Sequence, residues 1–518
     1  MSLLVERFLS RLENVTEELE VEDFNPVGFD ELSDIVRMQL DKDIKGLLSI
    51  WNVKIEDDYF ILPHPEYPDI ATKAVFSIKL NMTNFVFMLS ENKDLIWVFG
   101  QCEGMIDIVV TEEKIYRTSL SSKKPILDQI NKLSKLDPQR IIKFKKYGFL
   151  LSQSTPYHFF YDQLKNYIHF KRSAKKVSFD KSFFCLSKCD LPIDNECVYL
   201  FPTTVGNNQL RSGVAKELNE NMESFIYNNA AKSCTLASHE PHSLKLWFSI
   251  TGQKRSWLQQ VEGVKNIVAI LVSYFDDIEL YVDGVTAPDG KEIRNSDDEA
   301  IFCQIEKNVD SRCKVYSLIG KDYRYKIKKC SCADVFIANA GTGCMVPLRF
   351  CKKPGVLHSN TKLFSFPDEY PSTVKKFDKR YTINVLGEEK SRADFASYHI
   401  PWQHIFNLVV EVINKVKGIE IEMLKVPSVD EVAKSYSAQE SVRREKINSF
   451  YNIEQRIKPG QKSPDILREV ALSFEESGEI ETALKVMKKA LELRPEGPFI
   501  KKKIDKYHQI LQERGRKL

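Results

Sequence analysis

The sequence lacks long apolar runs. It has no stretch of eighteen apolar residues and no apolar segment behind a basic start, so we expect neither a membrane span nor a secretory signal. It also has little net charge, because 75 Lys and Arg stand against 72 Asp and Glu, which gives +3. A nucleic-acid-binding protein shows a strong basic excess on one face. We therefore predict a cytoplasmic protein with no nucleic-acid partner.

The sequence also lacks a metal-binding pattern. Its eleven cysteines are scattered without a CxxC pair, and no histidine cluster accompanies them, whereas a structural zinc site needs four convergent ligands. Asp41-Lys42-Asp43 has the spacing of a metal-binding DxD motif. It lies in a helical pattern, so we interpret it as a solvated helix face. We expect reduced thiols and no metal.

The chain is long enough for several domains. Its 518 residues exceed what one hydrophobic core supports, and 43% apolar and 28% charged residues are typical of folded chains. Changes of pattern divide it into a helical lead-in (1–50), an N-terminal α/β domain (51–240), a Rossmann-like domain (241–400), connecting helices (401–455), and a helical repeat with a basic terminal helix (456–518).

The first half mixes strands and helices. Short apolar runs broken by Asn, Asp, Pro and Gly fill residues 51–130 and predict a sheet. A buried strand is predicted at 147–152, followed by a polar turn and a helix from Pro156, because proline favours the first helical turn. A strand at 197–202 and a helix at 214–233 follow. We expect an α/β fold here, with the start of the Pro156 helix near the carboxyl end of the preceding strand.

From Leu244 the alternation becomes regular. Apolar strands such as LKLWFSI, IELYVDG and DVFIANAG alternate with helical patterns up to about residue 360. This alternation predicts right-handed βαβ units in a parallel sheet. In open parallel sheets, ligands bind at the carboxyl ends of the strands, where loops lead into helices.

A glycine turn, Gly341-Thr342-Gly343, joins DVFIANAG to the segment TGCMVPLRFC, which we expect to be a helix. A helix start leaves backbone N–H groups unpaired and carries the positive end of the helix dipole, so it attracts an anion. The glycines let a ligand approach the backbone closely. A plain tight connection between strand and helix would use the same residues, which is the competing interpretation.

A basic turn follows the first strand of the same predicted sheet. The segment TGQKR places Gly252, Lys254 and Arg255 at the carboxyl end of that strand. Two cations there can neutralise a diphosphate, and Arg255 can hold phosphate oxygens in bidentate fashion. A solvated basic loop is the alternative. Because both turns lie on the ligand-binding edge of the sheet, we predict that together they form a phosphate site.

The segment from about 244 to 360 resembles the donor-binding half of GT-B glycosyltransferases. The resemblance rests on a strand, glycine, basic residue and helix, followed by a strand, Gly-Thr-Gly, a proline-containing helix and a KPGV strand. It implies two Rossmann-like domains, with the donor in the C-terminal one and the acceptor in the N-terminal one. It also implies that the two turns described above hold the phosphates and sugar of a nucleotide sugar.

The segment after the glycine turn departs from that family. Many retaining members place an acidic residue in this helix, whereas TGCMVPLRFC has Arg349 and no acid. The departure leaves the donor and the anomeric outcome open. Asp283, at the end of IELYVDG, is a candidate polar contact to the donor, although an Asp-Gly turn needs no ligand to explain it.

The candidate catalytic residues lie in TPYHFFYD. His158 and Asp162 are four residues apart, so a helix places them on one face, where the carboxylate orients the imidazole and raises its basicity. A sugar hydroxyl needs a base near neutral pH to attack an anomeric carbon, and histidine is such a base. A structural histidine in an aromatic-rich helix is the competing interpretation.

The C-terminal region carries a repeat pattern. Small and apolar residues between Ala471 and Pro495 follow the spacing of a tetratricopeptide unit, and a helix at 499–515 is expected to cap it. This unit is a candidate for docking a protein partner or for self-association. The last eighteen residues are basic and suit either contact with an anionic membrane surface or a solvated helix.

These patterns favour one function and leave two alternatives. The favoured function is a metal-independent glycosyltransferase that needs no cofactor besides a nucleotide-sugar co-substrate and acts on a saccharide or glycolipid acceptor. By resemblance, it suits bacterial surface polysaccharide synthesis, peripheral to the inner membrane. The second candidate is a nucleotide-sugar epimerase or hydrolase of the same architecture. The third is a non-catalytic interaction protein that uses the tetratricopeptide-like repeat.

Overall fold

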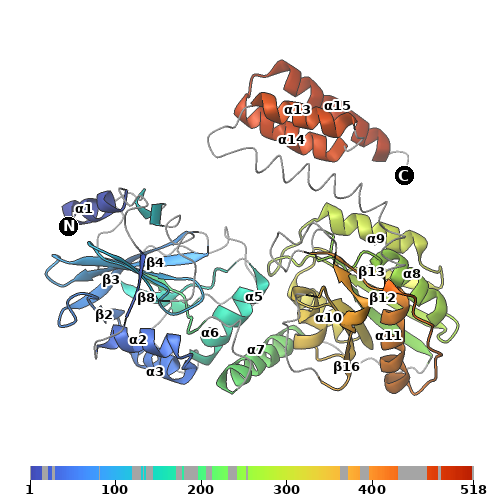
Figure 1. Cartoon of the computed structure of the whole chain (residues 1–518), viewed down its shortest axis with the longest axis horizontal. Helices are drawn as coiled ribbons and strands as arrows, with labels where there is room; N and C mark the ends of the chain where they lie inside the picture. The colour runs from blue at the N-terminus through green and yellow to red at the C-terminus, as the bar shows by residue number, and fades with distance from the viewer. Residues whose placement is uncertain are drawn as a thin grey trace. The chain divides into compact units, whose positions relative to one another are not determined.

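The computed structural model gives a mixed α/β chain with a helical C-terminal region (Figure 1). The described residues are 2–13, 21–25, 30–80, 82–118, 130–131, 133–135, 144–153, 155–170, 178–179, 197–205, 213–231, 242–252, 255–361, 371–384, 396–429, 464–476 and 480–515. The chain divides into two compact units, Met1–Val429 and Asp430–Leu518.

The first unit begins with a seven-stranded sheet of order β1-β7-β6-β5-β4-β3-β2. Its strands are β1 (Val21–Asp23), β2 (Ile61–Pro63), β3 (Ala71–Leu80), β4 (Thr83–Ser90), β5 (Ile96–Gln101), β6 (Ile108–Val110) and β7 (Ile115–Arg117). Strands β2 to β7 pair antiparallel with their neighbours in sequence, and β1 pairs parallel with β7. The apolar runs of this region therefore form hairpins joined by short turns.

Helices cover both faces of this sheet. In β4, Phe87 packs with α1 (Ser2–Glu13), whereas Met88 packs with α2 (Glu31–Leu40) and α3 (Ile44–Lys54). Successive side chains of a strand point to opposite faces, so consecutive apolar residues of β4 pack in two separate hydrophobic cores.

A small parallel sheet follows, of order β10-β8-β9. It consists of β8 (Lys146–Phe149), β9 (Ser178–Phe179) and β10 (Cys197–Leu200). A second Rossmann-like domain over 51–240 is therefore not confirmed in the described residues. The stretch from Ile61 to Arg117 is an antiparallel meander, because its turns are too short to hold the crossover helices that parallel strands require.

The helix predicted from Pro156 forms, but its type changes along its length. It runs from α5 (Pro156–His158) through the π-helix η2 (Phe159–Leu164) into α6 (Lys165–Phe170). Helix α7 (Val214–Ala231) follows β10. Its residue Met222 packs in one cluster with the aromatic side chains of η2.

The predicted parallel sheet after Leu244 is confirmed, with order β13-β12-β11-β14-β15-β16. Its strands are β11 (Ser243–Ser249), β12 (Asp277–Asp283), β13 (Cys313–Ser317), β14 (Val335–Asn339), β15 (Gly355–His358) and β16 (Val374–Lys376). All pairings are parallel. Counted from β11, this is the order 3-2-1-4-5-6 of a Rossmann fold, which reverses direction between β11 and β14.

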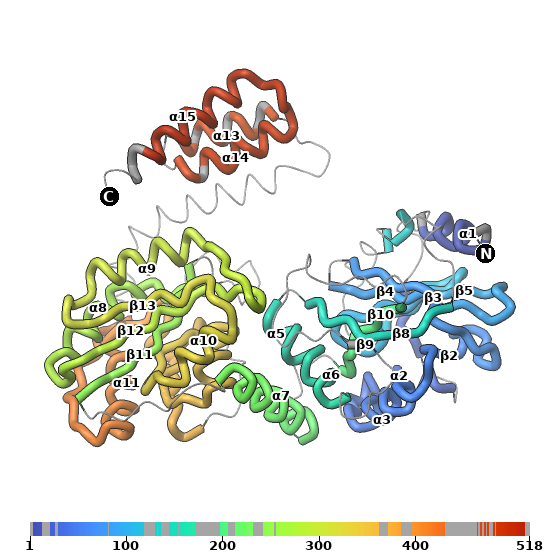
Figure 2. The backbone as a smooth tube through the Cα atoms, turned by 180° about the vertical axis from the view of Figure 1, so that it is seen from behind, coloured from blue at the N-terminus to red at the C-terminus, as the bar shows by residue number. Residues whose placement is uncertain are grey.

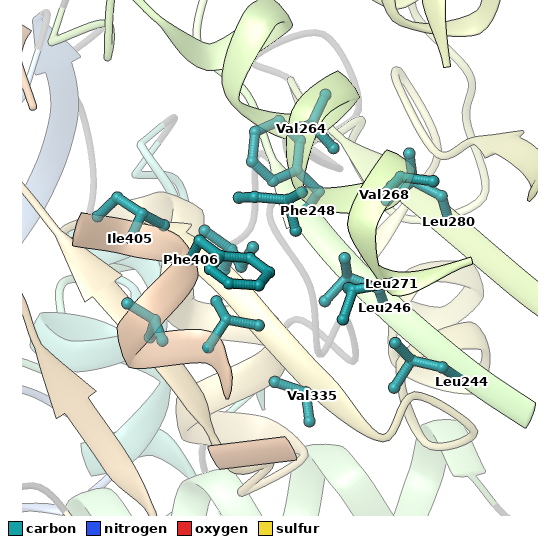
Figure 3. Packing of buried hydrophobic residues seen from close by; sticks show 14 of the residues in the cluster. Leu244, Leu246, Phe248, Val264, Val268, Leu271, Leu280, Val335, Ile405 and Phe406 are labelled. Carbon is teal, nitrogen blue, oxygen red and sulfur yellow. The ribbon is translucent and has the colours of Figure 1, made fainter. Parts of the chain in front are cut away.

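One face of this sheet is covered by α8 (Gln260–Leu271) and α11 (Trp402–Lys417). Figure 3 shows Phe248 of β11 between Val264 of α8 and Phe406 of α11. The apolar positions of both helices recur at three and four residues, so each helix presents one continuous apolar side to the sheet.

The opposite face shares a core with the N-terminal half of the unit. Trp247 and Phe336 from this face belong to the same cluster as α10 (Tyr323–Cys330), η2 and α7. Figure 2 shows α7 beside α10. Two parts of the chain that are distant in sequence therefore meet in an apolar layer.

The second unit contains α13 (Pro464–Glu476), α14 (Ile480–Leu493) and α15 (Pro498–Gly515). Ala471, Ala483 and Ala490 are buried in a core to which α15 adds Ile504, so the predicted capping helix packs on the other two. A tetratricopeptide identity stays a prediction. Among the described helices of the chain, none has the length and apolarity needed to cross a membrane.

Candidate functional site

Polar residues end four neighbouring strands of the six-stranded sheet. Ser249 ends β11, Asp283 ends β12, Asn339 ends β14 and His358 ends β15, and all four are buried. Open parallel sheets bind ligands where the strand order reverses, here between β11 and β14. The Ser249 hydroxyl donates to the carbonyl of Gly343 at 2.9 Å, which ties the end of β11 to the glycine turn after β14.

Arg255 lies against the glycine turn. Gly341 has φ +116, and a Cβ placed on it would lie 3.1 Å from Nη1 of Arg255. The structure thus brings together the two turns that we predicted to share a phosphate site. Lys254 lies outside the described residues, and the binding roles of Arg255, Gly341 and Thr342 stay predictions.

Gly252 and Gly343 are both required for close packing. A Cβ on Gly252 would lie 2.7 Å from Cβ of Asp297, and one on Gly343 would lie 1.9 Å from Oδ1 of Asn339. The N–H of Gly252 donates to Oδ1 of Asp298 at 2.9 Å. This N–H is already bonded to a carboxylate at the start of α9 (Ser296–Asn308), so a ligand phosphate would have to displace that carboxylate to use it.

Asp283 forms a buried ion pair that the sequence pattern does not reveal. Its Oδ1 lies 2.6 Å from Nζ of Lys326, and the two side chains are 6% and 0% exposed. Burial raises the pKa of Asp283, and Lys326 opposes that rise. Nζ also donates to the carbonyls of Gly284 and Val285 at 2.9 and 3.0 Å. Lys326, paired with Asp283, therefore holds the loop after β12, and the contact of Asp283 with a donor stays a prediction.

The segment after the glycine turn is not the α-helix that we expected. It consists of a 3₁₀ turn, η5 (Thr342–Cys344), and a π-helix, η6 (Met345–Phe350). Pro347 has no N–H to donate and disturbs an α-helical pattern, and the N–H of Cys351 instead bonds the carbonyl of Val346 at 3.0 Å, a step of five residues. Because so short a segment aligns few peptide dipoles, an anion here would gain little from a helix dipole, and the predicted anion site would depend mainly on Arg255.

His158 and Asp162 are in contact. Nδ1 of His158 lies 2.5 Å from Oδ2 of Asp162, and the side chains are 22% and 2% exposed. The pair lies at the start of η2, after the carboxyl end of β8, as the sequence pattern indicated. Glu103 lies nearby, where burial and the Asp162 carboxylate raise its pKa. The catalytic role of the pair stays a prediction.

Arg349 joins the two π-helices. Its Nε lies 2.9 Å from Oε1 of Glu223 on α7, and the hydroxyl of Tyr161 on η2 donates to the same oxygen at 2.9 Å. The guanidinium also lies 5.8 Å from the centroid of the Tyr161 ring. Arg349 therefore binds a carboxylate inside the protein.

The structure offers no metal site in the residues that it describes. Groups of three His, Cys, Asp or Glu side chains placed to hold an ion are absent from those residues. Asp41 and Asp43 lie at the junction of two helices: Asp41 caps the end of α2, and Asp43 caps α3 by accepting from the N–H of Gly46. Helix capping corrects our interpretation of this motif as one solvated helix face.

Comparison with known proteins gives little information. No known protein family matches the chain, and no curated protein is significantly similar to it. A solved structure of a TarM mutant from S. aureus, in complex with Fondaparinux, alpha-GlcNAc-glycerol and UDP, aligns over 80% of this chain and 90% of that one at 9% identity and a TM-score of 0.20. A score this low does not establish a shared fold, so the chemistry of the site rests on its own residues.

Several residues of the site escaped prediction from the sequence. Ser249, Asn339 and His358 are single polar residues at the ends of apolar runs. The rule that ligands bind at the carboxyl ends of parallel strands would have identified them as candidates. Asp298 and Lys326 gave no signal, because their partners lie 46 and 42 residues away.

Proposed function

We propose that the chain binds a nucleotide-activated sugar at the carboxyl edge of the six-stranded sheet and transfers the sugar to a saccharide or lipid-linked acceptor. The main support is the position of Arg255 against Gly341 at the point where the strand order reverses. A guanidinium beside a glycine turn offers charge and paired donors to a diphosphate while the missing side chain leaves space for it.

The electrostatic role of Arg255 follows from the reaction. When the anomeric carbon leaves the diphosphate, negative charge accumulates on the phosphate oxygens. A fixed guanidinium stabilises that charge more in the transition state than in the bound donor, which is the condition for faster reaction. Lys254, the preceding residue in sequence, would add a second positive charge to the same turn.

The acceptor side of the proposal uses His158. Its imidazole takes the proton from an acceptor hydroxyl as the oxygen bonds to the anomeric carbon and the nucleotide diphosphate leaves. Asp162, in contact with Nδ1 at 2.5 Å, orients the ring so that Nε2 faces the hydroxyl. We propose a docking role for the second unit, whose helix α15 carries the basic cluster Lys501 to Lys503.

The test is nucleotide binding by the full chain and by Arg255→Ala. Calorimetric titration with UDP, GDP, ADP and their common sugar derivatives should find a ligand for the wild-type protein. Loss of a bidentate charged contact should weaken it by about 10- to 100-fold, the equivalent of about 1.5–3 kcal/mol. Arg312, which is 60% exposed and paired with Asp310 in the same domain, supplies the control variant Arg312→Ala. Absence of binding by the wild-type protein, or equal binding by Arg255→Ala, would refute the proposal.

A further inference from the structure

The backbone of Arg255 has an unusual conformation. Its φ angle is +55°, in the left-handed region that residues other than glycine rarely adopt. Such a conformation persists only where the surrounding structure imposes it, and it is most frequent at functional sites. Contacts on both sides of Arg255 therefore have to hold it in place.

The first contacts join the two ends of the turn that contains Arg255. Gln260, at the start of α8, is buried, and both polar atoms of its side chain bond the backbone of Thr251, which follows β11. Oε1 accepts from the N–H of Thr251 at 3.2 Å, and Nε2 donates to the carbonyl of Thr251 at 3.1 Å. Gln260 therefore fixes the end of β11 against the start of α8.

Two hydroxyl groups bond across the same turn. Oγ1 of Thr251 donates to the carbonyl of Arg255 at 3.2 Å, and Oγ of Ser256 donates to the carbonyl of Thr251 at 2.8 Å. Because Gln260 holds both the N–H and the carbonyl of Thr251, the Thr251 hydroxyl meets the Arg255 carbonyl in a fixed position.

A segment that precedes α11 holds the other side of Arg255. The N–H of Ser256 donates to Oγ of Ser397 at 3.3 Å, and the carbonyl of Ser256 accepts from the N–H of Tyr398 at 3.0 Å. Trp257 and Tyr398 form a parallel β-bridge, and both are buried. Both flanks of Arg255 are thus fixed, whereas Arg255 itself is partly exposed.

The fixed turn places the guanidinium of Arg255 against the glycine turn. A Cβ on Gly341 would lie 3.1 Å from Nη1 of Arg255, and the φ of Gly341, +116, favours glycine. An arginine side chain loses much conformational entropy when it is ordered. A fixed backbone limits the positions that the guanidinium can occupy, and a charge that is already in position binds an anion more tightly than a mobile one.

We propose that Gln260 is a positioning residue that keeps Arg255 oriented for an anion bound beside Gly341. Naming that anion as the diphosphate of a nucleotide sugar rests on the function proposed above. Gln260 acts through Thr251, so removing its side-chain amide lowers anion affinity only while Arg255 is present.

The test uses the full chain and the variant Gln260→Met, which keeps the length of the side chain and removes both bonds to Thr251. Gln39→Met is the matched control. Gln39 is also buried, and its side chain also bonds the N–H and the carbonyl of one residue, Ile106, at 3.0 and 2.8 Å, in the N-terminal half of the unit. Gln260→Met is made in the wild type and in Arg255→Ala. The probe is inorganic pyrophosphate, and binding is measured by phosphorus NMR titration.

We expect the wild-type protein to bind pyrophosphate saturably and Gln260→Met to bind it about three- to tenfold more weakly. Gln39→Met should bind like the wild type. In Arg255→Ala, adding Gln260→Met should change the affinity by less than about twofold, because a positioning effect disappears with the group that is positioned. If Gln260→Met does not fold, Thr251→Val, which removes the hydroxyl bond to the Arg255 carbonyl, is tested in the same way.

An equal loss in both backgrounds, or pyrophosphate binding by Gln260→Met equal to that of Gln39→Met, would overturn the inference. A second measurement needs no ligand. Arg255→Gly should melt about 1–3 °C above Arg255→Ala, because glycine adopts the left-handed conformation without strain; if it does not, the turn is not held against strain and the inference is wrong.

The nucleotide titration separates the two proposals. Pyrophosphate binding that depends on Gln260 and Arg255, without any nucleotide binding, would keep this inference and refute the transferase function. Nucleotide binding that needs Arg255 but not Gln260 would do the reverse. A wild-type protein that binds neither pyrophosphate nor any nucleotide would refute both.

Discussion

Replacing Lys326 with methionine tests the ion pair below the loop after β12. Lys326 is fully buried, and its Nζ lies 2.6 Å from Oδ1 of Asp283. It also donates to the hydroxyl of Thr286 at 2.8 Å and to two backbone carbonyls. Methionine keeps most of the apolar stem of the lysine side chain. The loss of unfolding free energy in this variant therefore reports on the charge and its hydrogen bonds alone.

The magnitude follows from the charge that is left behind. Removing one member of a buried ion pair costs about 3–5 kcal/mol of unfolding free energy, because the other charge stays buried without compensation. Burial already raises the pKa of Asp283, and without Lys326 its pKa rises further. A carboxyl whose pKa is raised in the folded state binds its proton more tightly there than in the unfolded chain. The buried carboxyl therefore costs the protein little stability at a pH below the ordinary Asp range, and the cost grows as the pH increases. The deficit of Lys326→Met should therefore shrink between pH 7 and pH 4.

The assay is urea denaturation followed by tryptophan fluorescence, since Trp247 and Trp257 are buried in the same domain. The wild type, Lys326→Met and the double variant Asp283→Asn/Lys326→Met are compared at both pH values. The double variant should recover part of the loss, because it removes the unpaired charge. Lys326→Met within about 1 kcal/mol of the wild type at pH 7, or a double variant no more stable than the single one, would refute this reasoning.

Two further predictions concern the other candidate residues. His158→Ala should lower sugar transfer by about 10²- to 10⁴-fold with nucleotide affinity unchanged, as measured by product formation and titration; transfer at the wild-type rate would remove His158 from the base role. Burial favours a raised pKa for Glu475, but hydrogen bonds from Lys503, Lys506 and Tyr507 outweigh it and lower the pKa to about 2. Its stabilising contribution is therefore present above about pH 4.3 and lost on acidification, so Glu475→Gln should weaken the acid sensitivity of helix melting in circular dichroism; an unchanged pH dependence would contradict this.

The parallel sheet was predictable because its signals are local. Each strand after Leu244 is a short apolar run between turn residues, and each intervening helix has its own apolar period. The contact between Arg255 and Gly341 followed from one topological rule, that the carboxyl ends of parallel strands meet at one edge. Residues 253 and 254 lie outside the described structure, so the position of Lys254 in that predicted turn stays untested.

The topology of the N-terminal half was not predictable in the same way. Apolar runs at 51–130 identify strands, but the choice between hairpins and crossovers depends on turn length and on partners elsewhere in the chain. The two π-helices also lacked a clear signal. Pro347 indicates only that an α-helical pattern is disturbed there, and Glu223, the partner of Arg349, lies far away in the sequence. Long-range pairs of this kind have no signature in local spacing.

The apolar layer between the two halves of the first unit limits how those halves can move. The ring of Phe160 lies 5.0 and 5.1 Å from the rings of Tyr323 and Phe350, measured between centroids, in a cluster that includes buried side chains from both halves. Interfaces that open and close easily are usually more polar than this. Each large aromatic side chain pulled into water would cost about 1.5–3 kcal/mol. Wide hinge opening is thus an expensive motion, so we expect that any substrate would enter and leave through rearrangements of the strand-end loops around a fixed framework.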